Sequence, residues 1–169
     1  MKADGLTNLP GQEAFSSGRF ASGELGCVQR SVINAFRSVL ATTVTNLTLD
    51  GSAPAAASRI TLSTTDTTKN NRAWTFRISL IAVCTTTGGS ITAGDVYGAT
   101  YEGVIKRVGT TTSLVGTVQT VNTWADGGFV TNTPTVTITA DDTNEALDIS
   151  WTTVGADVST VVRVNGTLS

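Results

Sequence analysis

The side chains that could carry out chemistry in this sequence are carboxylates, because the chain contains no histidine. Histidine is the usual general base of hydrolases that use a nucleophilic serine or cysteine, so those mechanisms are excluded. A pair of carboxylates could still hydrolyse a glycosidic bond, with one group acting as the acid and the other as base or nucleophile. One candidate pair is Asp95 with Glu102. The other candidates are the clustered residues Asp141, Asp142, Glu145 and Asp148.

The acidic cluster has a simpler interpretation as a turn between two strands. Asp and Asn side chains commonly cap the backbone in turns, and Asp141-Asp142-Thr143-Asn144 separates two β-branched runs. The cluster also lacks the alternating Asp/Asn spacing and the terminal glutamate of a calcium-binding loop. We therefore predict a turn here, and a protein with no enzymatic activity, no cofactor and no metal site.

Two aromatic residues could bind a sugar if they lie at the surface. Tyr97 lies in a predicted loop next to glycine, and Trp124 precedes a turn sequence that contains Asp126. An exposed aromatic ring beside a carboxylate can stack on a sugar ring and bind its hydroxyls. Tyr97, Trp124 and Asp126 are therefore candidate glycan contacts. The more common alternative is that these rings belong to the core or to an interface.

The two cysteines, Cys27 and Cys84, are too few for a disulfide framework or a metal site. An immunoglobulin-type bridge would place a tryptophan on the strand after the first cysteine, whereas Trp74 shares a predicted strand with the second. We expect both cysteines to be reduced and buried.

Charge and hydropathy argue against two classes of partner. The 11 basic and 13 acidic residues give a net charge of −2, and the sequence has no lysine or arginine cluster to bind a phosphate backbone. The longest apolar run, residues 80–84, is too short to cross a bilayer, and residues 1–15 lack the apolar stretch of a secretory signal. We expect neither a nucleic-acid partner nor a membrane.

The pattern of apolar residues predicts an all-β fold. Large apolar side chains alternate along residues 74–84, which is typical of a central strand with one buried face. Residues 28–40 fit both helical and strand spacing, but the β-branched continuation to residue 50 favours one long strand. Further strands are expected at residues 99–106, 114–124, 135–140, 147–153 and 160–164. These runs predict a single antiparallel β-sandwich or jelly roll of about eight strands.

Residues 1–25 differ from the rest of the chain, because their apolar residues are scattered among Gly, Ser and Asn without a sustained period. This composition predicts an extended N-terminal arm, followed by a β-sandwich domain at residues 26–169. Large apolar side chains are costly to leave in water, so docking of the arm on a neighbouring subunit is as good an interpretation as a frayed terminus. The candidate anchors are Leu6, Leu9, Phe15 and Phe20.

Several short motifs occur in an order that resembles a β domain of tailed-bacteriophage structural proteins. They are S-G-R-F-A (17–21), G-C-V-Q-R-S (26–31), L-T-L-D-G-S (47–52), R-I-T-L (59–62), A-W-T-F-R-I (73–78), Y-E-G-V-I-K-R (101–107), L-V-G-T (114–117) and A-L-D-I-S-W-T (146–152). In that family the domain occurs in tail fibres and in small capsid-associated proteins. The resemblance extends from residue 20 to residue 169. The sequence differs from the family at residues 26–29, where it has G-C-V-Q in place of the frequent Gly-Asp-Ala-Gln.

The resemblance implies a virion structural protein. A short chain with an arm, one sandwich and no heptad or repeated shaft is more similar to a capsid cement (decoration) protein than to a fibre. Cement proteins bind the major capsid protein on the outer capsid surface, commonly as homotrimers, and tie neighbouring subunits together. The alternative is a tail fibre or neck appendage that binds a host-surface glycan. Independently, the low charge and the mean hydropathy of +0.11 indicate surface that an oligomer would bury.

Overall fold

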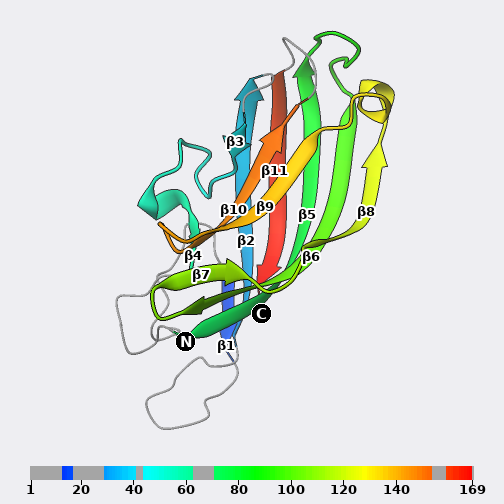
Figure 1. The fold of residues 1–169 in the computed structure, drawn as a ribbon. Helices are drawn as coiled ribbons and strands as arrows, with labels where there is room; N and C mark the ends of the chain where they lie inside the picture. Colours follow the sequence, from blue (N-terminus) through cyan, green and yellow to red (C-terminus); the bar gives the residue numbers. More distant parts are fainter. Residues whose placement is uncertain (1–12, 17–28, 41–43, 63–70, 154–158, 169) are drawn as a thin grey trace.

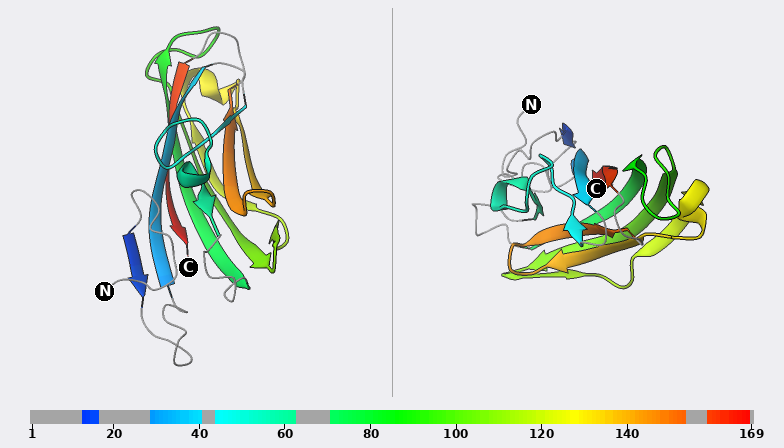
Figure 2. Two further views of the ribbon diagram at one scale, coloured as in Figure 1. Left: turned by 90° about the vertical axis from the view of Figure 1, so that its left-hand side faces the viewer. Right: turned by 90° about the horizontal axis from the view of Figure 1, so that it is seen from above.

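Two antiparallel β-sheets pack against each other in the computed structural model, which describes residues 13–16, 29–40, 44–62, 71–153 and 159–168 (Figures 1 and 2). Side chains from both sheets form a shared hydrophobic core. The fold is therefore the all-β sandwich that the sequence predicts.

The larger sheet has seven strands in the order β1-β2-β11-β5-β6-β7, and β8 pairs with β6 beside β7. Neighbouring strands are antiparallel throughout this sheet. Its strands are β1 (Glu13–Ser16), β2 (Gln29–Leu40), β5 (Arg72–Thr86), β6 (Val96–Val108), β7 (Thr111–Leu114), β8 (Gln119–Ala125) and β11 (Ser159–Leu168).

The smaller sheet has four strands, of which β10 is central. It pairs with β9 along its whole length and with two very short strands on its other side. The strands are β3 (Thr45–Asn46), β4 (Ile60–Thr61), β9 (Thr135–Asp141) and β10 (Ala146–Thr152), and two 3₁₀ helices are present at η1 (Ala56–Ser58) and η3 (Gly127–Val130). In Figure 2 the β9–β10 hairpin forms a second layer over one face of the larger sheet.

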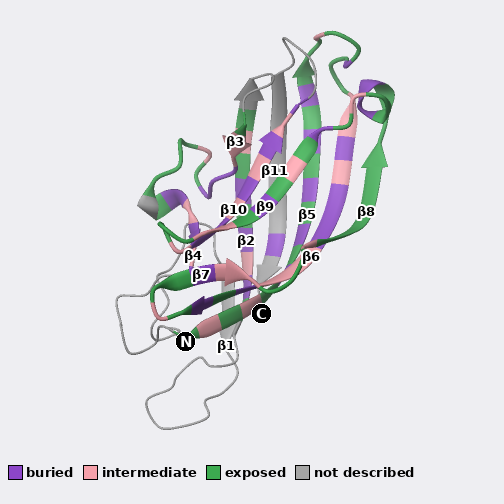
Figure 3. Cartoon of the chain, in the orientation of Figure 1, coloured by how far each residue is buried: buried purple, intermediate pink, exposed green. Residues whose placement is uncertain are grey.

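The alternation along β5 determines which face of the larger sheet is buried. From Phe76 to Cys84 every second side chain is buried, and the residues between them are exposed (Figure 3). This confirms the central strand predicted from the sequence. The smaller sheet covers the buried face, so the other face of the larger sheet carries the exposed residues of β5, such as Arg77 and Ile81.

Three aromatic rings connect the two sheets within the core. Tyr97 comes from β6, Phe129 from η3 and Trp151 from β10, and all three are buried. The ring centroids of Tyr97 and Trp151 lie 5.6 Å apart, and those of Phe129 and Trp151 lie 6.3 Å apart, with edge-on geometry in both pairs. Such aromatic contacts add to the free energy gained by burying the rings.

Two predicted strand boundaries are wrong. Residues 28–40 do form a strand, β2, but the expected continuous strand to residue 50 is interrupted: β3 pairs with β10 of the smaller sheet, while Thr48 forms a single bridge with Phe36 of β2. The run at 114–124 is likewise two strands, because Gly116 has a positive φ of 74° and breaks the extended backbone. β7 and β8 then pair with successive parts of β6.

The predicted arm falls almost entirely outside the described residues. Its described part is β1, which pairs antiparallel with β2 of the same chain and places Phe15 opposite Arg30. Leu6, Leu9 and Phe20 lie outside the described ranges. Their role as anchors, and that of the Phe15 side chain, stays a prediction.

Candidate functional site

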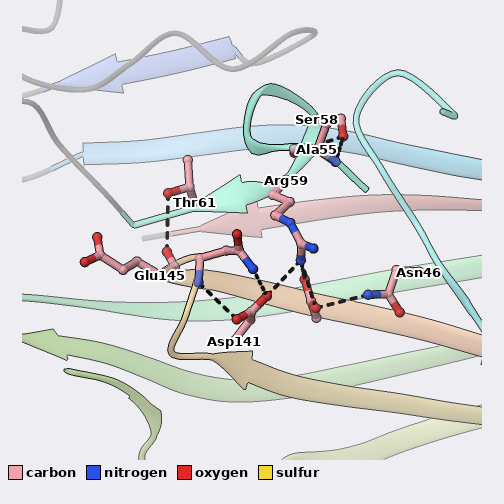
Figure 4. Close-up of polar contacts among 9 residues, drawn as sticks. Asn46, Ala55, Ser58, Arg59, Thr61, Asp141 and Glu145 are labelled. Atoms are coloured by element: carbon pink, nitrogen blue, oxygen red, sulfur yellow. Dashed lines mark hydrogen bonds and ion pairs between the residues drawn. The ribbon is translucent and has the colours of Figure 1, made fainter. Parts of the chain in front are cut away.

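The acidic cluster lies at and beside the turn of the β9–β10 hairpin, as the sequence predicts, and its carboxylates also form ion pairs with two arginines. Arg59 Nη1 lies 2.8 Å from Asp141 Oδ2 and 3.1 Å from Asp148 Oδ1 (Figure 4). Asn144 donates hydrogen bonds to Asp141 from its backbone and side chain, and Asn46 Nδ2 donates to Asp148. A single guanidinium therefore joins two carboxylates of one hairpin to the segment that leads into β4.

The two carboxylates of this network ionise differently. Burial opposes ionisation of Asp141, but hydrogen bonds from Asn144 and the charge of Arg59 outweigh it and hold the pKa of Asp141 below its ordinary value. At Asp148 burial dominates, and its pKa is raised although Arg59 partly offsets the effect. Carboxylates with divergent pKa values can act as acid and base in glycoside hydrolysis. Here, however, the Arg59 guanidinium occupies the space between them, where a substrate would have to bind.

Glu145 and Asp142 connect the same hairpin to the larger sheet. Arg107 of β6 is 5% exposed, and its Nη2 lies 2.6 Å from Glu145 Oε1. The backbone N–H of Thr112 in β7 donates to Asp142 Oδ1 at 2.5 Å. The Nε and Nη1 atoms of Arg107 have no hydrogen-bond partner, so Glu145 is the carboxylate that compensates this buried charge. All four acidic residues of the cluster therefore hold structure together.

The pair Asp95 and Glu102 cannot cooperate in hydrolysis. Asp95 precedes β6 and Glu102 lies within it, so a strand rise of about 3.3 Å per residue separates them by roughly 20 Å, well beyond the spacing of paired catalytic carboxylates. Glu102 forms an exposed ion pair with Arg77 at 3.5 Å. The candidate pairing from the sequence is thus wrong, because both residues belong to one extended strand segment.

Asp95 organises the turns at the end of the sandwich. Its Oδ2 accepts hydrogen bonds from the backbone N–H groups of Thr92 at 2.9 Å and Gly128 at 2.7 Å. These bonds hold the pKa of Asp95 below its ordinary value. A Cβ at Gly128 would lie 2.1 Å from the carbonyl oxygen of Ser90, so only glycine fits beside this carboxylate. Asp95 therefore fixes η3 against the preceding loop.

Tyr97 is not a surface aromatic residue, and its assignment as a glycan contact is wrong. It lies in β6 with 4% of its surface exposed and packs against Phe129 and Trp151. Its position next to Gly98 suggested a loop, but Gly98 is a strand residue. Burial, together with the nearby Tyr97 hydroxyl, also raises the pKa of Tyr101 above its usual range.

Trp124 is the exposed aromatic residue of this region. It lies in β8 opposite Gly98 of β6, and the six-membered part of its indole is 3.4 Å from the position that a Cβ of Gly98 would take. The ring is thus supported on one side, while 58% of the side chain remains exposed. Asp126 follows it, and its Oδ1 accepts a hydrogen bond from the backbone N–H of Val96 at 2.6 Å. The structure brings Trp124 and Asp126 to one edge of the sheet and leaves Tyr97 in the core.

β8 forms an exposed edge of the larger sheet, which we call the β8 edge (Gln119–Ala125). All seven of its residues are exposed (Figure 3). Within the described part of the chain, β8 pairs with β6 and with no other strand. No charged residue occurs between Val108 and Ala125. Four of the nine exposed large hydrophobic residues in the described ranges lie in this uncharged stretch: Val108, Val115, Val121 and Trp124.

An open groove of about 540 Å³ adjoins the start of the β8 edge. One side is apolar, formed by Val104 and Val115, and the other carries the Arg77–Glu102 ion pair. Gln119, the first residue of β8, also lines it. The groove therefore lies on the exposed face of the larger sheet, next to the strand whose outer side is unpaired.

The remaining candidate residues contribute no further site. Cys84 is buried and unpaired, as predicted, and burial raises the pKa of its thiol. Cys27 lies outside the described residues. In the described ranges no group of three or more His, Cys, Asp or Glu side chains could hold a metal ion, and no helix is long and apolar enough to cross a membrane.

Comparison with known proteins gives little similarity. No family model matches the chain, and no curated protein matches it either. Among solved structures, the tailspike protein of Acinetobacter phage vB_ApiP_P1 is similar over 97% of this chain, with 12% sequence identity and a TM-score of 0.31. The chain spans 23% of the length of that tailspike. A similarity of this size does not identify the function of the chain.

Sequence reasoning missed both the β8 edge and the two arginines that neutralise the acidic cluster. The β8 edge could have been predicted from the uncharged stretch between Val108 and Ala125. Arg59 and Arg107 left no local signal, because each pairs with residues far away in the sequence.

We predict that Glu145→Ala lowers the free energy of unfolding by about 3 to 5 kcal/mol, because it leaves the buried Arg107 guanidinium without its carboxylate. Chemical denaturation would measure the loss. The control is Glu102→Ala, which breaks the exposed pair with Arg77 and should cost at most about 1 kcal/mol. The double variant Arg107→Leu/Glu145→Ala should be more stable than Glu145→Ala alone. Equal losses for the two single variants would contradict the assignment.

We also predict that Asp95→Asn weakens the acid dependence of stability. The folded pKa of Asp95 lies below its unfolded value, so its contribution is present above the unfolded pKa and lost as pH falls through the folded one. Unfolding free energies measured between about pH 5 and pH 2 should therefore fall less steeply for Asp95→Asn than for the wild type. Parallel curves would show that the Thr92 and Gly128 hydrogen bonds do not bind the ionised carboxylate preferentially.

Proposed function

We propose that this chain is a structural component of a bacteriophage virion that acts by assembling with other subunits and not by catalysis. The observation that carries the proposal is the β8 edge, a strand with every residue exposed, no charge and an unpaired outer side. Free edge strands promote association, and monomeric proteins usually protect them with charges, proline, bulges or a covering segment. β8 has a bulge at Val121 but no charge and no proline. A strand without a charge or a proline is suited to contact with another subunit.

The use of the acidic residues supports a role without chemistry. Asp141, Asp142, Glu145 and Asp148 all bind groups of the same chain, and Asp95 holds the turns at the other end. Catalytic carboxylates must instead face a substrate at a suitable separation. These five acidic residues are therefore accounted for as structural groups.

We further propose that the virion role is that of a capsid cement protein. The ordered motifs resemble the β domain of phage structural proteins, and the sequence combines one sandwich with an N-terminal segment that carries scattered apolar residues. In this role the arm, residues 1–25, contacts the major capsid protein or a neighbouring copy on the outer capsid surface. Many copies, each with modest contacts, would stabilise a shell through multivalency.

We predict that removing residues 1–12 lowers the number of copies retained on purified particles. This deletion takes away Leu6 and Leu9 but keeps β1, and the unfolding midpoint of the free protein is measured alongside as the control for folding. Quantitative mass spectrometry of particles gives the copy number, which should correspond to many copies over the shell. Unchanged retention would refute the role of the arm. A few copies confined to one vertex would refute the cement role and favour a tail location.

A second function, binding of a host-surface glycan by a tail or neck appendage, is favoured by Trp124. Its indole is supported by Gly98 and has an exposed face, which suits stacking on a sugar ring. Asp126 lies two residues away, although one of its oxygens is engaged with Val96. Tyr97 takes no part, because it is buried.

If this second function holds, Trp124→Ala abolishes glycan binding without changing stability, because the removed ring is largely outside the core. Binding to a glycan array measures the loss, and thermal unfolding checks the fold. Val130→Ala is the matched control, since Val130 is also exposed and lies just beyond the same turn. No binding by the wild type would exclude the glycan role and leave the cement proposal unaffected.

A further inference from the structure

We propose that the β8 edge is a dimer interface in which the β8 strands of two copies pair antiparallel about a two-fold axis, joining two larger sheets into one continuous sheet. The proposal rests on the assembly role proposed above and identifies the partner at this edge as a second copy of the chain. It concerns the exposed residues of β8 and the groove beside them, none of which the acidic network or the core uses.

The backbone of β8 provides the chemistry of the interface. One side of the strand forms hydrogen bonds with β6, and within the described residues no strand lies on the other side. Among the described residues nothing pairs with the outward N–H and C=O groups, which have the geometry to form a new ladder, as in strand addition to a sheet edge. The edge at the other side of the larger sheet is less regular: the four residues of β1 cover only the start of β2, and Phe36 of β2 forms backbone hydrogen bonds with Thr48.

The absence of charge favours a second copy as the partner. Antiparallel two-fold pairing brings the residues near the axis close to their own equivalents in the other copy, so a charged residue there would repel its counterpart. From Val108 to Ala125 there is no charge to repel. For the same reason, a strongly charged partner would find no complementary group on this strand. An uncharged strand with exposed Val121 and Trp124 is best covered by an identical strand.

The pairing of β8 with β6 fixes which of its side chains share a face. Gln119 lies opposite Glu102, and Trp124 lies opposite Gly98, so both project from the exposed face of the larger sheet. Thr120 and Thr123 lie opposite Tyr101 and Ala99 and project from the other face. A register shift between these two halves leaves Val121 as the extra residue of a bulge.

Two copies must join so that like faces continue into each other. Among such registers, the one that pairs the most residues sets Gln119 against Trp124 of the second copy and Thr120 against its Thr123. The two-fold axis then passes between Val121 and Asn122. In this register the indole of each copy lies beside Gln119 of the other, next to the groove lined by Val104 and Val115. Pairing thus covers an exposed aromatic ring and an open groove together.

The first test is the mass of the purified protein in solution, measured by analytical ultracentrifugation over a range of concentrations. We expect the wild type to associate to a dimer and Val121→Lys to remain monomeric, because the substitution places two like charges at the axis. Val130→Lys is the matched control, since it adds the same charge at an exposed valine outside β8, and it should dimerise as the wild type does. A monomeric wild type, a trimer, or a Val121→Lys variant that still dimerises would overturn the proposal.

The second test reads the register by cross-linking. Under oxidising conditions the double variant Thr120→Cys/Thr123→Cys should form a covalent dimer, because these positions face each other across the axis. Thr120→Cys alone should not, since it faces Thr123. Cross-linking of the single variant at the same rate would overturn the register. If the wild type is monomeric yet abundant on particles, the two-fold pairing fails and the virion role stands; if it dimerises but is absent from particles, only the virion role fails.

Discussion

The pairing of β5 with β6 is the constraint on which the rest of the structure depends. These are the two longest strands, and they align from Arg72 opposite Arg107 to Val83 opposite Val96. Because side chains alternate between faces, this register decides at once which residues enter the core. It places Tyr97 beside the Trp151 ring of the smaller sheet at one end, and Arg107 beside the acidic hairpin at the other. A shift of the β5–β6 register by one residue would move both Tyr97 and Arg107 to the exposed face.

The buried charge at Arg107 explains why the acidic residues are concentrated in one turn. Removing a guanidinium from water is costly unless a carboxylate compensates it, and Glu145 can do so only if the β9–β10 hairpin packs on β6 and β7. The same hairpin uses Asp141 and Asp148 to hold Arg59. The smaller sheet is therefore attached by hydrophobic packing around Trp151 at one end and by ion pairs at the other. Hydrophobic packing supplies free energy of folding, whereas ion pairs of this kind chiefly select one relative arrangement of the two sheets.

The features predictable from the sequence are those with a local physical cause. The alternation from Trp74 to Cys84 and the turn at Asp141 are encoded by neighbouring residues, and both are confirmed. Features that depend on distant contacts were not predictable. Nothing near Tyr97 in the sequence indicates that Phe129 and Trp151 cover it, whereas the neighbouring Gly98 favours a loop. The passage from β2 to β3 keeps a β-branched pattern while the chain changes sheets, because both sheets favour the same side chains.

The exposed strand also limits what kind of assembly the chain can form. If the uncharged β8 edge paired with a different edge of the next copy, each addition would leave another β8 edge free, and the contact would continue into a ring or a filament. When the β8 strands of two copies pair with each other, neither copy has a β8 edge left for a third copy. At the other side of the larger sheet, β1 pairs with only the first four residues of β2, and Phe36 further along β2 forms a bridge with Thr48, so that edge is shared between two short segments. A two-fold contact at β8 therefore gives a closed unit, which could then bind a larger structure through surfaces other than the sheet edges.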